Sequence, residues 1–389
     1  MSANNDLSSR GFCRPGRGAD QIVLPRNSTQ TLTRVNNTSY GPTGLPTIRS
    51  IISIVGNGST IRRTASAAPF RLLTVAQRGD ITARLALSDT TLTGGRAVRS
   101  SASSYSAEGG AMLSLGGRVA LTNSRVTGNV AVTGGGVSIN YNVLYPYGGS
   151  LTLINSTVSG NRASGRGGGI AHQNYSPVSI TNSTVSGNSA GTDGGGVYNG
   201  YQSGFTAINS TISGNVAVSG DGGGLFHQSG RSVDLTHTTI SANRAGARGG
   251  GIDNRFGTLA LTQALVSGNR APQGPEVFRD AGSGGEVTVA RFNIFGHSGN
   301  AGLVGFTRGT TDIVPTQRLA GVLNTRLANN GGSTLTHALV NGSPAIDAIN
   351  DGTCPPPATD QRGLSRPRDG NRDGGVACDI GAVESLGPP

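Results

Sequence analysis

Lysine and tryptophan are absent from this chain of 389 residues, and aromatic residues make up only 4% of it. A globular domain of this length fills its core with large apolar side chains, so an ordinary compact core is excluded. Glycine is abundant instead, with 64 residues. The glycines follow no G-X-Y period, which excludes collagen, and Gly plus Pro stay below the level of disordered Pro/Gly-rich chains. A repetitive β architecture remains, because it can build a core from small inward residues stacked coil on coil.

No stretch of 18 apolar residues occurs, so the sequence predicts no membrane span. The first ten residues lack the apolar segment of a signal peptide. The 31 basic residues exceed the 20 acidic ones and give a net charge of +11. All the basic residues are arginines, and they are scattered along the chain. We therefore expect general attraction to acidic surfaces but no specific nucleic-acid partner.

Two sequence markers recur together along the middle of the chain. The pattern N-S-T-V-S-G-N-x-A begins at Asn155, Asn182 and Asn209, with variants at Asp89, Asn123, His237 and Gln263. Three glycines followed by an aliphatic residue begin at Gly134, Gly167, Gly194, Gly222 and Gly249. In the most regular stretch both markers advance by about 27 residues, so they belong to one repeated structural unit.

Aliphatic residues within each unit fall into three groups that predict three short strands. The first group has period 2, as in Leu151 and Leu153; the second lies beyond a bend, as in Val158; the third follows the glycines, as in Ile170. Strands that stack on their counterparts one unit later make a right-handed parallel β-helix. We expect about ten coils: irregular first coils and an N-terminal cap over 1–80, a regular helix over 81–295, and an irregular C-terminal cap over 296–389.

The Gly-Asn pair of the repeated motif, for example Gly160 and Asn161, marks a turn between strands. Both residue types tolerate left-handed backbone, and stacked Asn amides can hydrogen-bond from coil to coil. Ala242 occupies the glycine position in one unit. This replacement predicts that the position does not need a positive φ in every coil.

Both ends of the chain resemble a known family. The N-terminal runs are A-N-N-D…G-F-C-R-P-G-R-G-A-D-Q-I-V-L-P, Y-G-P-T-G-L-P-T-I and I-V-G-N-G-S-T-I-R-R. They resemble the region after the C-S-L-R-E-A box of bacterial secreted β-helix proteins. The C-terminal runs N-N-G-G-S-T-L-T-H-A-L, G-S-P-A-I-D-A, D-Q-R-G, R-P (Arg366 and Pro367) and C-D-I-G-A-V-E are similar to the choice-of-anchor Q domain. The repeats between them resemble those of polymorphic outer-membrane proteins.

The resemblance implies a bacterial protein that is exported or displayed at the cell surface. The C-S-L-R-E-A box itself is absent, so we expect upstream sequence, including a signal peptide, to be missing before Met1. Cys354 and Cys378 lie 24 residues apart in the predicted cap and would form a disulfide in an oxidising compartment. The resemblance places a partner for Cys13 in the missing segment. Three unpaired thiols are the alternative.

The residues before the glycine runs form a column that starts at Thr133 and is charged from there on: Arg166, Asp193, Asp221 and Arg248 follow in successive units. Two carboxylates flanked by guanidinium groups could hold Ca²⁺ or a uronate and serve as the catalytic residues of a polysaccharide lyase. The alternative is a ladder of surface ion pairs, Arg166 with Asp193 and Asp221 with Arg248. Ca²⁺ needs six or more oxygens, and this column supplies two side chains, so we expect no obligatory cofactor.

Two further columns follow the glycines. Alternation points Tyr198, Phe226 and Asp253 outward, where the two rings could form a platform for a sugar, or simply a cross-strand aromatic pair. The next column carries His172 and His227 and points inward, which predicts an internal hydrogen-bonded ladder in preference to acid–base catalysis. No zinc spacing, P-loop or nucleophile elbow is present in the sequence.

These patterns support a non-enzymatic structural stalk or adhesin of the cell surface or extracellular space, whose outer faces contact glycans or other surface components. One alternative is a polysaccharide lyase or glycosidase that acts on acidic glycans. A second is a filament subunit that stacks end to end on copies of itself.

Overall fold

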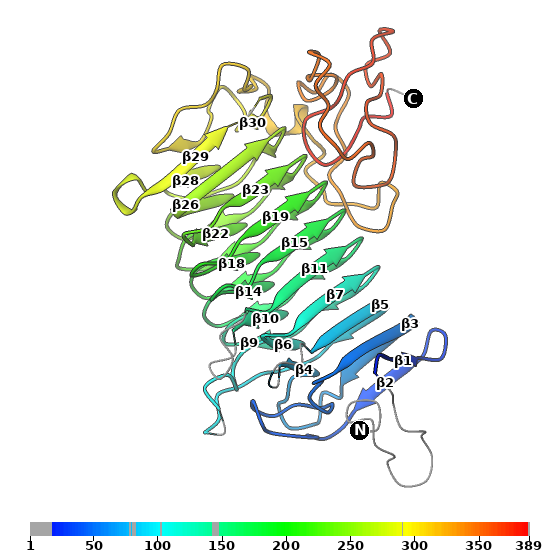
Figure 1. The fold of residues 1–389 in the computed structure, drawn as a ribbon. Helices are drawn as coiled ribbons and strands as arrows, with labels where there is room; N and C mark the ends of the chain where they lie inside the picture. The colour runs from blue at the N-terminus through cyan, green and yellow to red at the C-terminus, as the bar shows by residue number, and fades with distance from the viewer. Residues whose placement is uncertain are drawn as a thin grey trace.

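The computed structural model describes residues 18–77, 79, 83–101, 103–141, 148–289 and 291–387. Within them the chain winds into a solenoid of parallel strands that rises from the N-terminal to the C-terminal coil (Figure 1). Ten strands stack along one face in the described part, which agrees with the predicted number of coils. The same residues include two short 3-10 helices, η1 (Ala281–Ser283) and η2 (Leu319–Gly321), and no helix long and apolar enough to cross a membrane.

Each regular coil contributes a strand to each of three faces. The first face consists of β1 (Asp20–Val23), β3 (Ile51–Arg63), β5 (Arg84–Thr93), β7 (Arg118–Thr122), β11 (Ser150–Ile154), β15 (Val178–Thr181), β19 (Phe205–Ile208), β23 (Val233–Thr236), β26 (Ile252–Thr262) and β29 (Gly285–Val289). The second face has β2 (Thr29–Leu32), the far ends of β3 and β5, then β8 (Arg125–Thr127), β12 (Thr157–Ser159), β16 (Thr184–Ser186), β20 (Thr211–Ser213), β24 (Thr239–Ser241), β27 (Leu265–Val266) and β30 (Ile294–Phe295). The third face has β4 (Leu73–Ala76), β6 (Met112–Leu115), β10 (Val137–Asn140), β14 (Ile170–His172), β18 (Val197–Asn199), β22 (Leu225–Gln228), the start of β26, β28 (Val277–Arg279) and β31 (Leu303–Val304).

A fourth strand of two residues, which the sequence pattern did not reveal, lies between the second and third faces. This short ladder consists of β9 (Val130–Ala131), β13 (Arg162–Ala163), β17 (Ser189–Ala190), β21 (Val216–Ala217) and β25 (Arg244–Ala245). Its inward residue is always alanine, and each of these alanines is buried. The final Ala of the repeated motif is the sequence feature that marks this fourth strand.

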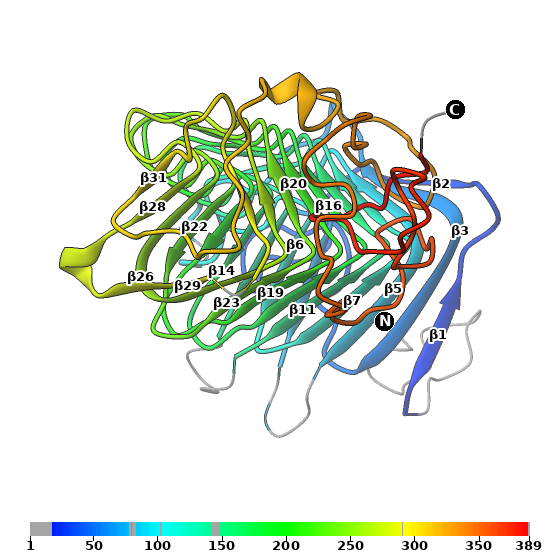
Figure 2. The same cartoon turned by 90° about the horizontal axis from the view of Figure 1, so that it is seen from above.

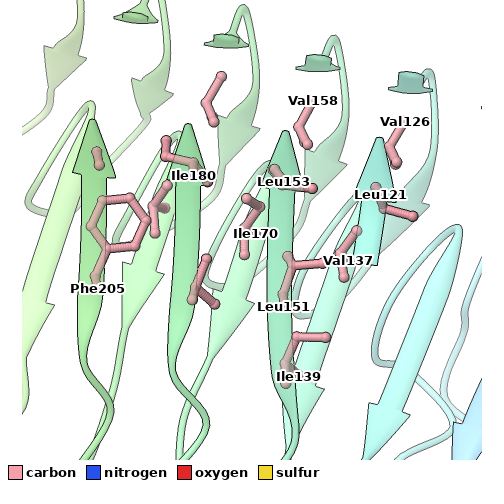
Figure 3. Packing of buried hydrophobic residues seen from close by; sticks show 14 of the residues in the cluster. Leu121, Val126, Val137, Ile139, Leu151, Leu153, Val158, Ile170, Ile180 and Phe205 are labelled. Atoms are coloured by element: carbon pink, nitrogen blue, oxygen red, sulfur yellow. The ribbon is translucent and has the colours of Figure 1, made fainter. Parts of the chain in front are cut away.

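The core is built from the three aliphatic columns that the repeat predicted. Leu151 and Leu153 point inward from the first face, Val158 from the second and Ile170 from the third, and equivalent residues stack above and below them (Figure 3). Successive strands pair in register, for example Leu151 with Val178 in β11 and β15. Similar side chains therefore lie one strand spacing apart, which fills a narrow interior without large aromatic residues.

Left-handed backbone occurs at three places in each regular coil, and the third is the first glycine of the three-glycine corner. The glycine position of the motif has a positive φ throughout the repeats, and Ala242 adopts φ 59° there, so the prediction that it would escape this conformation was wrong. The adjacent coils have the same turn, at Gly214 and Gly268, so Ala242 adopts this left-handed conformation although it is unfavourable for alanine. The motif's first residue also has a positive φ, 50° at Asn155, and this bends the chain between the first and second faces.

The three-glycine corner needs glycine at each position, as residues 167–169 show. Gly167 has φ 66°. A Cβ on Gly168 would lie 2.3 Å from the carbonyl oxygen of Gly195, and one on Gly169 would lie 2.8 Å from that of Gly196. Backbones of successive coils thus approach too closely for any side chain.

Buried asparagines form a continuous ladder beside this corner. The Oδ1 of Asn188 accepts hydrogen bonds from the backbone N and the Nδ2 of Asn161, each at 3.0 Å, and the same pattern links Asn188 to Asn215 and Asn215 to Asn243. The ladder ends at Asn269, whose backbone N donates to the carboxylate of Glu276. The predicted stacking of Asn amides is present.

The C-terminal segment lies along the side of the solenoid as well as at its end (Figures 1 and 2). The helix continues past residue 296, because β31 still pairs with β28. Later residues fold back over the second face, where Thr211 Oγ1 donates to Gln361 Oε1 at 2.6 Å. The outward column of that face changes from threonine to Leu265 and Ile294 near the end, and these two side chains pack into a second apolar cluster with residues of the C-terminal segment. Without the C-terminal segment this apolar patch would face solvent, which explains why the segment covers the side.

Two residues of the runs that resemble the choice-of-anchor Q domain, Arg366 and Glu384, help attach the C-terminal segment to the solenoid. Arg366 and Glu384 make an ion pair of 2.9 Å in which both side chains are fully buried. Arg366 also donates to the Nδ1 of His237 in the solenoid at 3.0 Å. Burial, reinforced by the charge of Arg366, lowers the pKa of His237 to about 3, so the ring stays neutral and accepts this hydrogen bond.

Candidate functional site

A column of large side chains lies on the outer surface of the third face. Tyr198, Phe226, Asp253 and Phe278 are in register on β18, β22, β26 and β28. The rings of Tyr198 and Phe226 stack with centroids 5.4 Å apart and an interplanar angle of 8°. The sequence placed both rings correctly on the outer side of the sheet but predicted them to be exposed. They are only 4% and 1% exposed, so an open sugar platform at these rings is wrong.

Guanidinium groups cover the aromatic column and explain its burial. Arg166 lies 5.2 Å above the centroid of Tyr198, and its Nη1 donates to Tyr198 Oη at 3.1 Å. Arg255 lies 5.1 Å above the ring of Phe226. Such cation–π contacts contribute about 0.5–2 kcal/mol each, depending on solvent exposure. The arginines therefore replace solvent as the outer layer of this face.

A β-bulge directs Arg255 toward this layer. The pairing of β22 with β26 is regular up to His227 and Asn254 and then skips to Gln228 and Phe256, which leaves Arg255 as the extra residue. Bulges re-aim side chains in this way. Arg255 was not a sequence candidate, because alternation cannot reveal a bulge.

The charged column predicted from the sequence is a ladder of ion pairs in the structure. Arg166 Nε lies 3.4 Å from Asp193 Oδ2, and Arg248 Nη2 lies 3.1 Å from Asp221 Oδ2. Asp221 also pairs with Arg255. The hydrogen bond with Asp221 raises the pKa of Arg248, which makes this arginine a poorer base.

The carboxylates of this ladder accept hydrogen bonds from their neighbours. Asp193 Oδ1 accepts from the backbone N of Asp221 at 3.2 Å, and Asp221 Oδ1 accepts from the backbone N of Arg248 at 3.0 Å. Among the described residues, no group of three or more His, Cys, Asp or Glu side chains is placed to hold a metal. The arrangement matches the ion-pair alternative and offers Ca²⁺ few free oxygens.

Asp253 is the least satisfied group of the cluster. Its side chain is fully buried, and neither carboxylate oxygen has a hydrogen-bond donor among the described residues. Arg248 Nε and Arg255 Nε lie 4.0 and 3.9 Å from it. Burial raises the pKa of Asp253 to about 7, with a further contribution from the charge of Asp221. Asp253 is therefore placed to exchange a proton near neutral pH.

A groove of about 390 Å³ opens beside this cluster. Its lining consists of Arg166, Gln173, Tyr198, Tyr201, Gln202, Gln228, Gly230, Arg255, Phe256 and Ser283. Tyr201 and Phe256 are 62% and 48% exposed, and Tyr201 meets Tyr175 edge to face at 6.2 Å. The repeat does not predict these residues, because they lie past the third strand, where it is irregular. Several aromatic residues lie in these loops although the chain has few aromatics, and this clustering could have indicated the groove.

The inward histidine column is buried, as alternation indicated. His172, Asn199, His227 and Asn254 are all fully buried. Asn199 Nδ2 and His227 Nδ1 are 3.0 Å apart. Burial lowers the pKa of His172 to about 3 and that of His227 to about 4, so both rings are neutral and belong to the core.

Two features of the C-terminal segment bear on the earlier expectations. Cys354 and Cys378 form a disulfide with Cα atoms 6.0 Å apart, while Cys13 lies outside the described residues.

Residues 369–374, D-G-N-R-D-G, have the spacing of the first half of an EF-hand calcium loop, a motif that was not among the candidates above. Ile380 stands at the twelfth position, where such a loop has its bidentate glutamate. The loop therefore lacks the main ligand of that motif.

Comparison with known families supports the repeat architecture. Residues 90–270 match the family described as a right handed beta helix region. No curated protein matches the chain. The matched segment covers the regular coils from the end of β5 to the turn after β27, and the strands there are parallel and stacked in register. The chain thus folds as a right-handed parallel β-helix.

Proposed function

We propose that this protein is a non-enzymatic β-helix of the bacterial surface or extracellular space that binds glycans through the groove on its third face. The observation that carries the proposal is the groove lining. It combines the exposed rings of Tyr201 and Phe256 with three glutamine amides and two guanidinium groups. Aromatic faces pack on the C–H surface of sugar rings, and amides and guanidiniums bond hydroxyls, so the lining has the chemistry of a saccharide site.

Location outside the cytoplasm is supported by the disulfide and by the resemblance of both chain ends to secreted bacterial β-helix proteins. The long, regular solenoid suits a stalk that carries a binding surface away from its attachment point.

The alternative of a polysaccharide lyase finds less support in the same cluster. A lyase needs a group that is free to remove a proton and accessible to the substrate. Both candidate arginines are paired with aspartates, and the side chain of Asp253 is fully buried. Replacing Asp193 and Asp221 with alanine and measuring polyuronate cleavage, with and without Ca²⁺, tests this alternative. Cleavage by the wild type that the double variant loses would favour the enzyme.

A glycan microarray probed with the purified protein tests the binding proposal. We expect the wild type to bind a set of glycans that neither the Tyr201→Ala variant nor the Phe256→Ala variant binds. The matched control is Val218→Ala, which removes an equally exposed apolar side chain outside the groove. An array on which the folded wild type and the two groove variants give the same signals would refute the proposal.

A further inference from the structure

The charge of the groove lining is of one sign. Arg166 and Arg255 are its charged residues, and no carboxylate belongs to the lining. The aspartates of the cluster lie behind the guanidiniums, where Asp193 holds Arg166 and Asp221 holds Arg255. A ligand in the groove therefore meets cationic nitrogens first.

Arg255 is only partly satisfied by its aspartates. Its Nη2 pairs with Asp221, whereas its Nε is buried without a hydrogen bond and lies 3.9 Å from Asp253. No partner of its Nη1 is found among the described residues. The planar guanidinium can therefore bond a ligand carboxylate without first breaking its pair with Asp221.

Asp253 depends on Arg255 and Arg248 for the stability of its charge. It lies between Phe226 and Phe278 in the outer column and has no hydrogen-bond donor among the described residues to stabilise its ionised form. The charged groups that face it are Arg255 on its own strand, Arg248 and Asp221 from the turns before β26 and β22, and Asp280 after β28. An anion that binds Arg255 would compete with Asp253 for the same cation.

We propose that the groove binds a carboxylated saccharide through Arg255 and Arg166, and that binding of this anion raises the protonated fraction of Asp253, with the proton taken from solvent. The inference rests on the proposed function, since it assigns the ligand class of the same groove. The proton converts the Asp253 carboxylate to a neutral carboxyl, so the ligand's negative charge replaces that of Asp253 beside Arg255. Tyr201 and Phe256 contact the sugar ring.

The direction of the pH effect follows from this competition. With a pKa of about 7, Asp253 is largely neutral at pH 5.5 and ionised at pH 8. A sugar carboxyl with a pKa of about 3.5 stays ionised over this range. Affinity should therefore fall as the pH rises through 7, by about fivefold for one added charge near the site.

Calorimetric titration with tetragalacturonate tests the inference, and its methyl ester serves as the uncharged probe with the same rings. We expect the acid to bind the wild type about tenfold more tightly than the ester at pH 5.5, and about fivefold more weakly at pH 8 than at pH 5.5. Arg255→Gln should abolish the preference for the acid. Asp253→Asn should keep that preference and lose the pH dependence. Arg118→Gln and Asp234→Asn, on the first face, are the charge-matched controls.

Titrations at pH 7 in two buffers of different ionisation enthalpy count the protons taken up by the wild type, so the test does not depend on the folding of any variant. Uptake of a substantial fraction of a proton per bound acid, and none per bound ester, supports the inference. Equal binding of acid and ester overturns the ligand class but leaves the proposed function standing. Acid binding without proton uptake overturns the role of Asp253. If neither probe binds, the inference is wrong, and the glycan array alone then decides the proposed function.

Discussion

Replacing Asn188 with alanine should destabilise the protein strongly, although this residue is remote from the groove. Its side chain is fully buried in the middle of the asparagine ladder. It makes four hydrogen bonds: two accepted from Asn161, one donated to the carbonyl of Val158 at 3.0 Å and one donated to Asn215 at 2.9 Å.

The magnitude follows from what the truncation leaves behind. The amide Nδ2 of Asn161 keeps its bond to Val126, and the Oδ1 of Asn215 keeps a bond from the backbone of residue 188, so both remain satisfied. The backbone N of Asn161 loses its acceptor and stays buried. The three other lost hydrogen bonds at ~1 kcal/mol each, plus ~1–3 kcal/mol for the unpaired buried donor, give a loss of about 4–6 kcal/mol.

Urea unfolding followed by far-UV circular dichroism measures this loss as a change in midpoint. Ser189→Ala is the matched control, because Ser189 follows Asn188 at the start of β17 and its side chain makes no hydrogen bond within the described part of the chain. It should change stability by less than about 0.5 kcal/mol. A loss below about 1 kcal/mol for Asn188→Ala would refute the view that the ladder stabilises the coils. So would equal effects of the two substitutions.

Three other changes test the remaining structural conclusions. Replacing Cys354 and Cys378 with serine should cost about 3 kcal/mol in the C-terminal segment, seen as faster proteolysis there, with the reduced wild type behaving alike. Gln361→Ala should release the same segment from Thr211 and expose it to protease, while the β-sheet dichroism stays unchanged. Because folding raises the pKa of Asp253 from 3.8 to about 7, the wild type should lose stability as the pH rises from 4 to 7. Asp253→Asn should remove up to about 4 kcal/mol of that decline; identical urea midpoints of variant and wild type at pH 5 and 8 would contradict it.

The fold could be predicted because each coil repeats the same physical solution. Leu151, Val158 and Ile170 each stand for a column, and an error in one unit is corrected by the others. The ion pairs of the charged column could also be anticipated, because parallel stacking in register places residues of neighbouring units one strand spacing apart.

The exposure of the outer rings could not be predicted in the same way. Alternation tells which side of a strand a residue occupies, but it does not tell what covers that side. Tyr198 and Phe226 lie outside the sheet as expected, yet arginines from neighbouring turns bury them. The C-terminal segment is a parallel case, since it contacts Thr211 across 150 residues and has no repeat that could reveal its path.

The residues best placed to bind a ligand lie where the repeat becomes irregular. In the preceding coils the third-face strand ends at Asn199 or at Gln228, whereas β26 inserts Arg255 as a bulge and extends without a break into the first face. This one added residue brings a guanidinium over Phe226, beside Asp221 and into the groove wall. A regular coil stacks identical side chains and so offers the same surface many times over. A single break in register is sufficient to make one surface differ from the others, which is why a binding site is expected at this coil rather than along the whole solenoid.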